Sequence, residues 1–446
     1  MTSDDTSARL ARLQATIEDL LQEARHQGAS AAEAGVSGSA GIEVGVRLGE
    51  VETVEHTRDN GLGITVYFGQ RKGSASTSDL SPAAVREAVR AACTIAGHTQ
   101  PDPAAGLADR QRLATVIPDL DLYHPWDLAV EDAIALAVAC EDAARGSDPR
   151  IVNSEGASLS SHSGFQVYGN SLGFVGGYPT TRHGLSCAVI GQEGEAMQRD
   201  YWWTTARSAT DLEAPEAVGR RAAERTLARL GGRQIPTQTA PILFRAEVAT
   251  GLLRQLTGAI NGTSLYRRAS FLLDHLGQRI FPEFVRIYEE PLLPRGLSSS
   301  PFDGDGVATS AKDFVREGVL TSYVLDTYSA RRLGMETTGN AGGVRNLHIA
   351  MGELDLAGLM REMGTGLLVT ELMGSGVNPV TGDYSRGASG FWVEGGEIAY
   401  PVEEITIAGN LKQMYQGLVA VGNDCDFPGS TRTGSWLIDE MTIAGG

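Results

Sequence analysis

Cysteine is scarce in this sequence of 446 residues: the four cysteines are Cys93, Cys140, Cys187 and Cys425. They lie far apart, with no CxxC pair and no cluster of cysteine with histidine. Disulfide-stapled domains have dense, paired cysteines, and zinc knuckles need closely spaced ligands. The sequence therefore predicts neither a disulfide framework nor a zinc knuckle, and this cysteine usage favours a reduced, cytoplasmic setting.

Long apolar runs and an excess of positive charge are also missing. No stretch approaches the roughly 18 uninterrupted apolar residues that cross a bilayer, and the acidic start of the chain lacks the pattern of a signal peptide. The 55 acidic and 37 basic residues give a formal net charge of -18, which repels the phosphate backbone of nucleic acids. We therefore expect no membrane span and no nucleic-acid partner.

The composition that remains is typical of a globular protein, with 42% hydrophobic and 21% charged residues. The length suffices for two or three domains of about 100 to 200 residues each. In the first half, apolar residues recur at helical spacing, and Ser81 followed by Pro82 has the pattern of a helix start. These patterns predict helices in residues 9–24, 82–98, 126–144 and 214–230.

Alternating apolar and polar residues predict strands between these helices. The segments "GIEVGVRLGEVETVEH" and "GLGITVYFGQRKGSAS" are separated by the turn-rich "TRDNG", so we expect an antiparallel pair with its turn there. Residues 101–125 are rich in Pro, Asp and Gly and are predicted to link two parts of the chain. Beyond Pro241, brief alternating runs separated by glycine favour a large antiparallel sheet or barrel.

The predicted fold class is therefore α+β, with N-terminal mixed α/β domains followed by a large antiparallel, β-rich and barrel-like C-terminal domain. We divide the chain into an N-terminal α/β domain, a middle mixed α/β segment and the C-terminal β-rich domain. Their predicted bounds are residues 1–100, 101–235 and 236–446.

Motifs that carry chemistry are missing from the sequence taken by itself. It contains no phosphate-binding GxxxxGK[ST] and no GxGxxG. The eight histidines form no HxH, HxxxH or HExxH pattern, so no local pair of zinc ligands exists. His162 stands between serines on a predicted strand, where neighbours face opposite sides, and Asp303 with Asp305 favours a polar turn over a calcium loop.

One short phrase, "GLLRQLTGAINGTSLYRRASF" at residues 251–271, has the apolar spacing of a helix that carries the metal-binding residues in a helical metallopeptidase. Leu252, Leu253, Leu256 and Ile260 fall on one face. The polar positions between them carry no histidine and no carboxylate.

The last third of the chain resembles the TldD/PmbA family, and within it the PmbA branch, also called TldE. The resemblance is carried, in order, by "GMETTGNAGG", "MGSGVNPVTGDYSRGASGFWVEGGEIAYPVEEITIAGNLKQM" and "GNDCDFPGSTRTGSWLIDEMTIAG". The N-terminal "VRLGEVETVEHTRDNGLGITVYFGQRKGSASTSDLS" is similar to the opening domain of the same family, so the likeness spans nearly the full length.

In this family the TldD member carries HExxxH on a helix and a further cysteine ligand, and it is a metallopeptidase for short or unfolded peptides. TldE assembles with it and lacks those ligands. By position, the resemblance sets HExxxH against Arg254, Gln255 and Ala259. Arginine has no lone pair to give, alanine has no ligand atom, and glutamine is no carboxylate base.

The resemblance thus implies a non-catalytic subunit that shapes a substrate chamber, binds no cofactor itself, and has a TldD-like partner in which zinc is expected. It also implies a role in peptide maturation or in the removal of unstructured proteins. Two alternatives stay open, an autonomous hydrolase with scattered metal ligands and a peptide-binding regulatory module. Cys425 lies upstream of the stretch that matches the partner's cysteine, so we expect a structural or free thiol.

A segment of small residues could bind peptide by strand addition, which needs only a free backbone edge. The alternative is that this segment completes a sheet in the core. The residues concerned are Tyr384, Ser385, Gly387, Ser389, Gly390 and Phe391.

Overall fold

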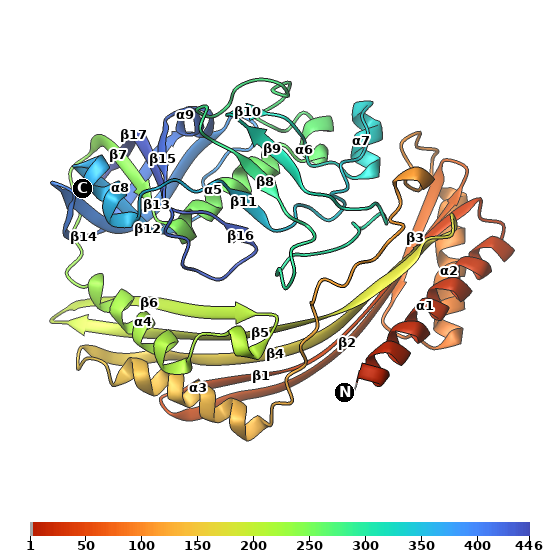
Figure 1. Ribbon diagram of the computed structural model, residues 1–446, viewed down its shortest axis with the longest axis horizontal. Helices are drawn as coiled ribbons and strands as arrows, with labels where there is room; N and C mark the ends of the chain where they lie inside the picture. The colour runs from red at the N-terminus through yellow and green to blue at the C-terminus, as the bar shows by residue number, and fades with distance from the viewer. Residues whose placement is uncertain (1–2) are drawn as a thin grey trace.

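The computed structural model describes residues 3–446, and Figure 1 shows a long curved sheet with a β-rich C-terminal unit beside one of its edges. The sheet is antiparallel, with strand order β3-β2-β1-β4-β5-β6. Its strands are β1 (Ala31–Arg47), β2 (Glu50–Phe68), β3 (Arg71–Thr77), β4 (Ile151–Asn170), β5 (Val175–Glu193) and β6 (Ala196–Ala206).

Four helices cover one face of this sheet. They are α1 (Ser3–His26), α2 (Pro82–His98), α3 (Val130–Arg145) and α4 (Pro215–Ala228). Ile17 and Leu20 of α1 pack with Ala34 of β1, and Cys140 of α3 packs with Val44 further along the same strand. Both β1 residues are even-numbered, so the two groups of helices lie on the same face of the strand.

The predicted helices are present with small changes at their ends. Ser81 accepts a hydrogen bond from the backbone N–H of Ala84 at 3.4 Å, which confirms the predicted N-cap of α2. The third helix begins at Val130 and not at Trp126. Residues 126–129 stay extended, and the Trp126 ring packs edge-on against His183, with ring centroids 5.5 Å apart. Tertiary packing has therefore overridden the helical spacing at that point.

The predicted turn at "TRDNG" is wrong. Residues 57–61 lie inside β2 and pair with Ser37–Gly41 of β1, whereas the hairpin turn lies at Leu48 and Gly49. Both turn residues have positive φ, 55° and 81°. The carboxylate of Glu141, which is fully buried on α3, accepts the backbone N–H of each at 2.8 Å. A contact from a distant helix thus fixes a turn that local residue preferences do not indicate.

The C-terminal unit, residues 238–446, contains a closed barrel of five strands, which confirms the predicted fold class. The barrel strands are β7 (Gln238–Phe244), β12 (Gly366–Met373), β13 (Asp383–Glu394), β14 (Glu397–Asn410) and β17 (Trp436–Ala444). Neighbours pair in the order β14-β13-β12-β7-β17, and β17 pairs back onto β14. The β7–β12 pair is parallel and the others are antiparallel.

A second sheet and several short helices complete this unit. The sheet runs β10-β9-β8-β11-β16, and β15 (Leu418–Val421) extends the barrel at β17. The remaining strands are β8 (Ile287–Glu289), β9 (Lys312–Arg316), β10 (Val319–Leu320), β11 (Leu347–Ile349) and β16 (Thr431–Arg432). The helices are α5 (Ala246–Ala259), α6 (Gly262–Tyr266), α7 (Thr327–Leu333), α8 (Leu356–Met363) and α9 (Leu411–Gln416).

The division of the N-terminal half at residue 100 stays a prediction, but strands from both sides of it form one continuous sheet. The linking segment after it is held by the C-terminal unit, because Arg331 of α7 donates to the carbonyls of Gly106 and Leu107 at 3.1 and 2.6 Å. Within residues 3–446 no helix is both long and apolar enough to cross a membrane.

Replacing Glu141 with alanine leaves the N–H groups of Leu48 and Gly49 without their buried acceptor. We expect the free energy of unfolding to fall by about 3 kcal/mol, since each hydrogen bond to a charged group contributes about 1.5 to 3 kcal/mol. Urea unfolding followed by circular dichroism measures this. Glu131→Ala on the exposed side of the same helix is the matched control, with an expected loss below about 1 kcal/mol. Equal losses in the two variants would contradict this account of the turn.

Candidate functional site

The helix α5 is the element that the resemblance sets against a metal-binding helix. Its apolar residues Leu252, Leu253 and Leu256 are buried in the core that also contains Trp436 and Ile438 of β17. This confirms the predicted helical face. The Tyr415 hydroxyl donates to the carbonyl of Leu252 at 2.9 Å, which joins α9 to the middle of α5.

The three positions set against HExxxH face in different directions. Arg254 is exposed, Gln255 is half-buried, and Ala259 is only 4% exposed within the core. Ala259 is further fixed because its carbonyl accepts the Ser270 hydroxyl at 2.6 Å. Position 254 therefore faces solvent, whereas position 259 faces the core of the C-terminal unit.

The residues present offer no ligand set in their place. Arg254 is cationic, and neither alanine nor a primary amide supplies an imidazole or a carboxylate. Throughout residues 3–446, no group of three or more histidine, cysteine, aspartate and glutamate side chains is arranged to hold a metal ion.

The beginning of α5 is joined to the N-terminal sheet by a buried cluster of charged residues, which we call the ion-pair cluster. It consists of Asp200 on β6, Arg225 and Arg229 at and just after α4, Arg245 and Glu247 at the start of α5, and Glu371 on β12. Arg225 lies 2.6 Å from Glu247 and 3.4 Å from Asp200, and its side chain is about nine-tenths buried. The orientation of α5 therefore depends on charges contributed by the other half of the chain.

Sequence reasoning missed this cluster. The only local signal is the spacing of Arg221, Arg225 and Arg229 on one face of a helix that is otherwise amphipathic. That spacing indicates a basic stripe, but it does not indicate which acidic residues meet it.

The segment proposed for strand addition is β13, and it pairs on both sides. From Gly387 to Val393 it pairs with β12, and from Asp383 to Glu394 it pairs with β14. Tyr384 is also covered by a bridge to Val377, and its side chain is buried. No free backbone edge remains along this strand, so the pairing favours the second reading, in which the segment completes a sheet.

The six residues of that segment differ in exposure. Tyr384, Ser389 and Gly390 are buried, Gly387 and Phe391 are half-buried, and Ser385 is exposed. The hydroxyl of Ser389 donates to the Glu371 carboxylate at 3.1 Å and accepts from Arg229 at 3.0 Å. Ser389 therefore belongs to the surroundings of the ion-pair cluster.

A cavity of about 470 Å³ lies between the end of β6 and two loops of the C-terminal unit, residues 293–297 and 425–432. Cys425 and His348 both line it, yet no hydrogen bond joins them among the interactions of the described residues. Burial raises the pKa of the Cys425 thiol, which disfavours the nucleophilic thiolate. Burial lowers the pKa of His348, which lies 3.4 Å from Glu290. The cavity therefore contains no activated cysteine.

The stretch Gly429–Trp436, which the resemblance sets against the partner's cysteine, contains no cysteine, histidine or carboxylate. Thr433 is fully buried, and its hydroxyl accepts from Trp436 Nε1 at 2.7 Å and donates to the carbonyl of Gly434 at 2.8 Å. Cys425 is a free thiol, as expected from the sequence.

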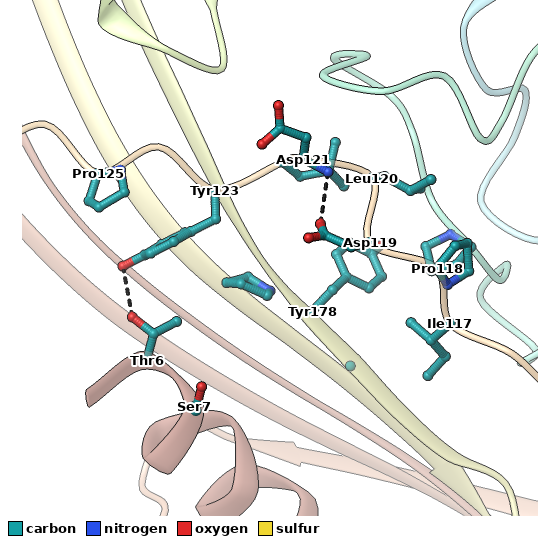
Figure 2. A pocket seen from close by; sticks show the side chains of 14 residues that line it. Thr6, Ser7, Ile117, Pro118, Asp119, Leu120, Asp121, Tyr123, Pro125 and Tyr178 are labelled. Atoms are coloured by element: carbon teal, nitrogen blue, oxygen red, sulfur yellow. Dashed lines mark hydrogen bonds between the residues drawn. The ribbon is translucent and has the colours of Figure 1, made fainter. Parts of the chain in front are cut away.

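A second cavity, of about 570 Å³, lies between the start of α1, residues 117–125 and the beginning of β5 (Figure 2). Tyr123 reaches across it to the hydroxyl of Thr6 at 3.4 Å, and Asp119 accepts the backbone N–H of Asp121 at 2.9 Å. The Tyr178 hydroxyl contacts that of Ser300 at 2.8 Å. Tyrosine, proline and aspartate side chains dominate this surface, and it contains no pairing of a nucleophile with a base.

Other sequence candidates have structural roles. Asp303 confirms the predicted polar turn, since one carboxylate oxygen accepts the N–H groups of Asp305 and Val307, each at 2.9 Å. Its other oxygen accepts the N–H of Ala341 at 2.9 Å, while burial raises the pKa of this carboxyl to about 6. His162 lies half-buried on β4 and pairs with Gly41 in the sheet.

Installing the missing motif should not create a metal site. We expect the variant Arg254→His, Gln255→Glu, Ala259→His to purify without stoichiometric zinc, because position 259 is buried in the core whereas position 254 is exposed to solvent. Elemental analysis of the purified variant measures the metal. Ala259→His alone should lower the free energy of unfolding by about 1 to 3 kcal/mol through overpacking. The exposed Arg254→His is its control. Stoichiometric zinc in the triple variant would overturn this view of α5.

Removing Arg225, the most buried cation of the ion-pair cluster, leaves Asp200 and Glu247 with only one cationic neighbour each, Arg229 at 3.7 Å and Arg245 at 3.5 Å. Arg225→Met should lower the free energy of unfolding by about 3 to 5 kcal/mol, the usual cost of breaking a buried ion pair. Arg220→Met on the exposed side of α4 is the control and should change it by less than about 0.5 kcal/mol. Chemical denaturation of both variants provides the comparison. A loss no larger than the control's would show that the cluster does not join the two halves.

Comparison with known proteins gives a consistent assignment. Residues 32–96, 123–230 and 237–445 match the family models for domain 1, the central domain and the C-terminal domain of the PmbA/TldA metallopeptidases. The chain is 53% identical to metalloprotease PmbA of Escherichia coli O157:H7 over 93% of this chain and 92% of that protein. It is 48% identical to a PmbA homolog of Haemophilus influenzae, with the same coverage.

Solved structures show the same architecture. A protein from Bacteroides thetaiotaomicron superposes with a TM-score of 0.91 at 29% identity, covering 97% of this chain and 98% of that one. TldE from Thermococcus kodakarensis superposes with a TM-score of 0.84 at 22% identity, covering 96% and 100%. With three domain models matched in order and half of all residues shared with a PmbA protein, the chain belongs to the PmbA/TldD metallopeptidase family, in its PmbA/TldE branch.

Proposed function

We propose that this chain is the non-catalytic subunit of a two-subunit metallopeptidase, in which a TldD-like partner holds the zinc ion and acts on short or unfolded peptides. The observation that carries the proposal is the state of α5. Its apolar face is retained in the core, whereas Arg254, Gln255 and Ala259 supply neither a metal ligand nor a carboxylate base.

The role of the chain in such a complex is to enclose the substrate. The sheet face that carries no helices of this chain has small, polar side chains in neighbouring register, with Gly45 beside Ser158, and Ser158 beside Ser186. Trp203 and Tyr201 follow on β6, with ring centroids 5.5 Å apart. A polar face with a few aromatic side chains suits an unfolded peptide, whose backbone needs hydrogen-bonding groups and whose side chains vary.

Two alternative functions, an autonomous hydrolase and a peptide-binding regulatory module, can be told apart from this one by experiment. The relatives carry the name metalloprotease, which is compatible with an autonomous hydrolase whose ligands come from remote segments. A peptide-binding regulatory module would bind peptide without any catalytic partner. We also propose that the complex acts in peptide maturation and that it is cytoplasmic. Peptide maturation is what the family resemblance implies.

Co-expression with a TldD-like chain that carries HExxxH tests the proposal. We expect the two chains to elute together in size exclusion and to contain about one zinc ion per complex, because three protein ligands and one open position make a single catalytic site. Peptidase activity on an unfolded peptide should require both chains. Replacing the partner's motif histidines with alanine should remove zinc and activity, whereas Arg254→Ala with Gln255→Ala here should leave the zinc content unchanged.

The alternatives predict different results in the same experiment. Stoichiometric zinc and peptidase activity in this chain alone would establish an autonomous hydrolase and contradict the proposal. Binding of the peptide to this chain alone, with no complex formed by the TldD-like chain, would favour the regulatory module.

A further inference from the structure

The cavity at the end of β6 is lined by two arginines that have no acidic partner. Arg207 directly follows β6, and Arg432 comes from β16 in the C-terminal unit. Figure 1 shows the loop before β16 next to the end of β6. Among residues 3–446, neither guanidinium forms an ion pair, because both donate only to backbone carbonyls. In a chain with a net charge of -18, two cations without a counter-charge in one cavity point to an anionic ligand.

Arg207 is the more buried of the two, with 8% of the residue exposed. Its guanidinium donates to the carbonyls of Thr181, Gly296 and Leu297 at distances from 2.8 to 3.3 Å. These carbonyls orient the guanidinium but do not neutralise its charge, and burial lowers its pKa. A buried charge is costly unless an opposite charge lies beside it. The cavity next to Arg207 is therefore a favourable place for an anion.

Arg432 has donors to spare. It is half-buried, and it donates to the carbonyls of Phe427 at 3.2 Å and Cys425 at 3.4 Å. A guanidinium has five N–H groups in a planar fork that matches a carboxylate. Two of the five are used here, so the others are available to a ligand.

Three carboxylates also line the cavity, and each one already has a partner. The pairs are Asp211 with Arg295 at 3.2 Å, Glu213 with the indole N–H of Trp202 at 3.1 Å, and Asp426 with Arg221. These carboxylates therefore do not neutralise the two unpaired arginines. Their negative charges repel a doubly charged anion more strongly than a singly charged one, which favours a carboxylate over a phosphate.

We propose that this cavity binds a small organic carboxylate, whose oxygens accept hydrogen bonds from Arg432 and Arg207. Leu293, Leu297 and Pro428 also line the cavity and offer apolar surface to the rest of the ligand. The volume of about 470 Å³ lies within the usual range of small-molecule sites. The carboxylate is either the C-terminal group of a peptide, in which case the site rests on the proposed function, or a free organic acid.

A purely structural role for Arg207 does not account for the whole site. Such a role explains its three carbonyl contacts, which join the sheet to the C-terminal unit. It does not explain the unused donors of Arg432 in the same cavity. Arg432 is therefore the residue to change, because loss of Arg207 also breaks the connection between the two parts of the chain.

Titration of the isolated chain with N-acetyl-dialanine, followed by ligand-observed NMR, tests the site. We expect saturable binding, and a dissociation constant that rises about tenfold in Arg432→Gln, because the charge-assisted hydrogen bonds of one guanidinium are lost. Arg361→Gln, at an exposed arginine of α8, is the matched control and should leave the dissociation constant unchanged. The C-terminal amide of the same ligand should bind the unchanged protein about tenfold more weakly than the acid, since it carries no charge. This comparison needs no variant and does not depend on the folding of one.

Two further ligands distinguish the sources of the carboxylate. Acetate that binds as tightly as N-acetyl-dialanine would assign the site to a free organic acid, whereas a clear preference for the dipeptide would assign it to the C-terminal end of a peptide. Failure to form a complex with a TldD-like chain would contradict the proposed function but leave this binding intact. The site itself would be overturned by an absence of binding, by an amide that binds as well as the acid, or by indifference to Arg432→Gln. Binding of inorganic phosphate in place of the carboxylates would overturn it too.

Discussion

Burial of the apolar face of α5 is the constraint on which the C-terminal unit depends. Leu252, Leu253 and Leu256 fill the space beside β7, β12 and β17, and Tyr415 and Ser270 bond to backbone carbonyls of the same helix. Each buried leucine contributes about 1.5 to 3 kcal/mol, so the helix is kept whether or not it carries chemistry. The polar side chains at Arg254 and Gln255 are free of that constraint.

The ion-pair cluster ties this helix to the rest of the molecule. Charges from β6 and α4 meet charges at the start of α5 and on β12, in surroundings from which water is largely excluded. Arg207 adds a second connection, because its guanidinium donates to the carbonyls of Thr181 in the sheet and Leu297 in the C-terminal unit, at 2.9 and 2.8 Å. The curved sheet and the C-terminal unit are therefore joined at two separate places.

Much of the fold follows from local patterns in the sequence. Helical spacing located α1, α2 and α4, Ser81 marked the start of α2, and the alternating runs beyond Pro241 indicated the barrel-like domain. The failures share one physical origin, which is that local patterns do not specify distant partners. The hairpin turn is set by Glu141 from another helix, and β1 pairs with β4 more than a hundred residues away. The pairing of β13 on both sides and the partners of Arg225 are non-local in the same way.

The candidate site was foreseen in part. The positions Arg254, Gln255 and Ala259 came from the resemblance, and the spacing of leucines placed them on a helix. That Ala259 faces the core while Arg254 faces solvent depends on how α5 packs in the C-terminal unit, which no short segment determines.

The most direct test of where the complex binds zinc is an anomalous-difference map at the zinc absorption edge from crystals of the two-subunit complex. The account predicts one peak, at the partner's HExxxH motif, and none beside α5 of this chain. A zinc peak within coordination distance of residues 254–259 here would contradict it.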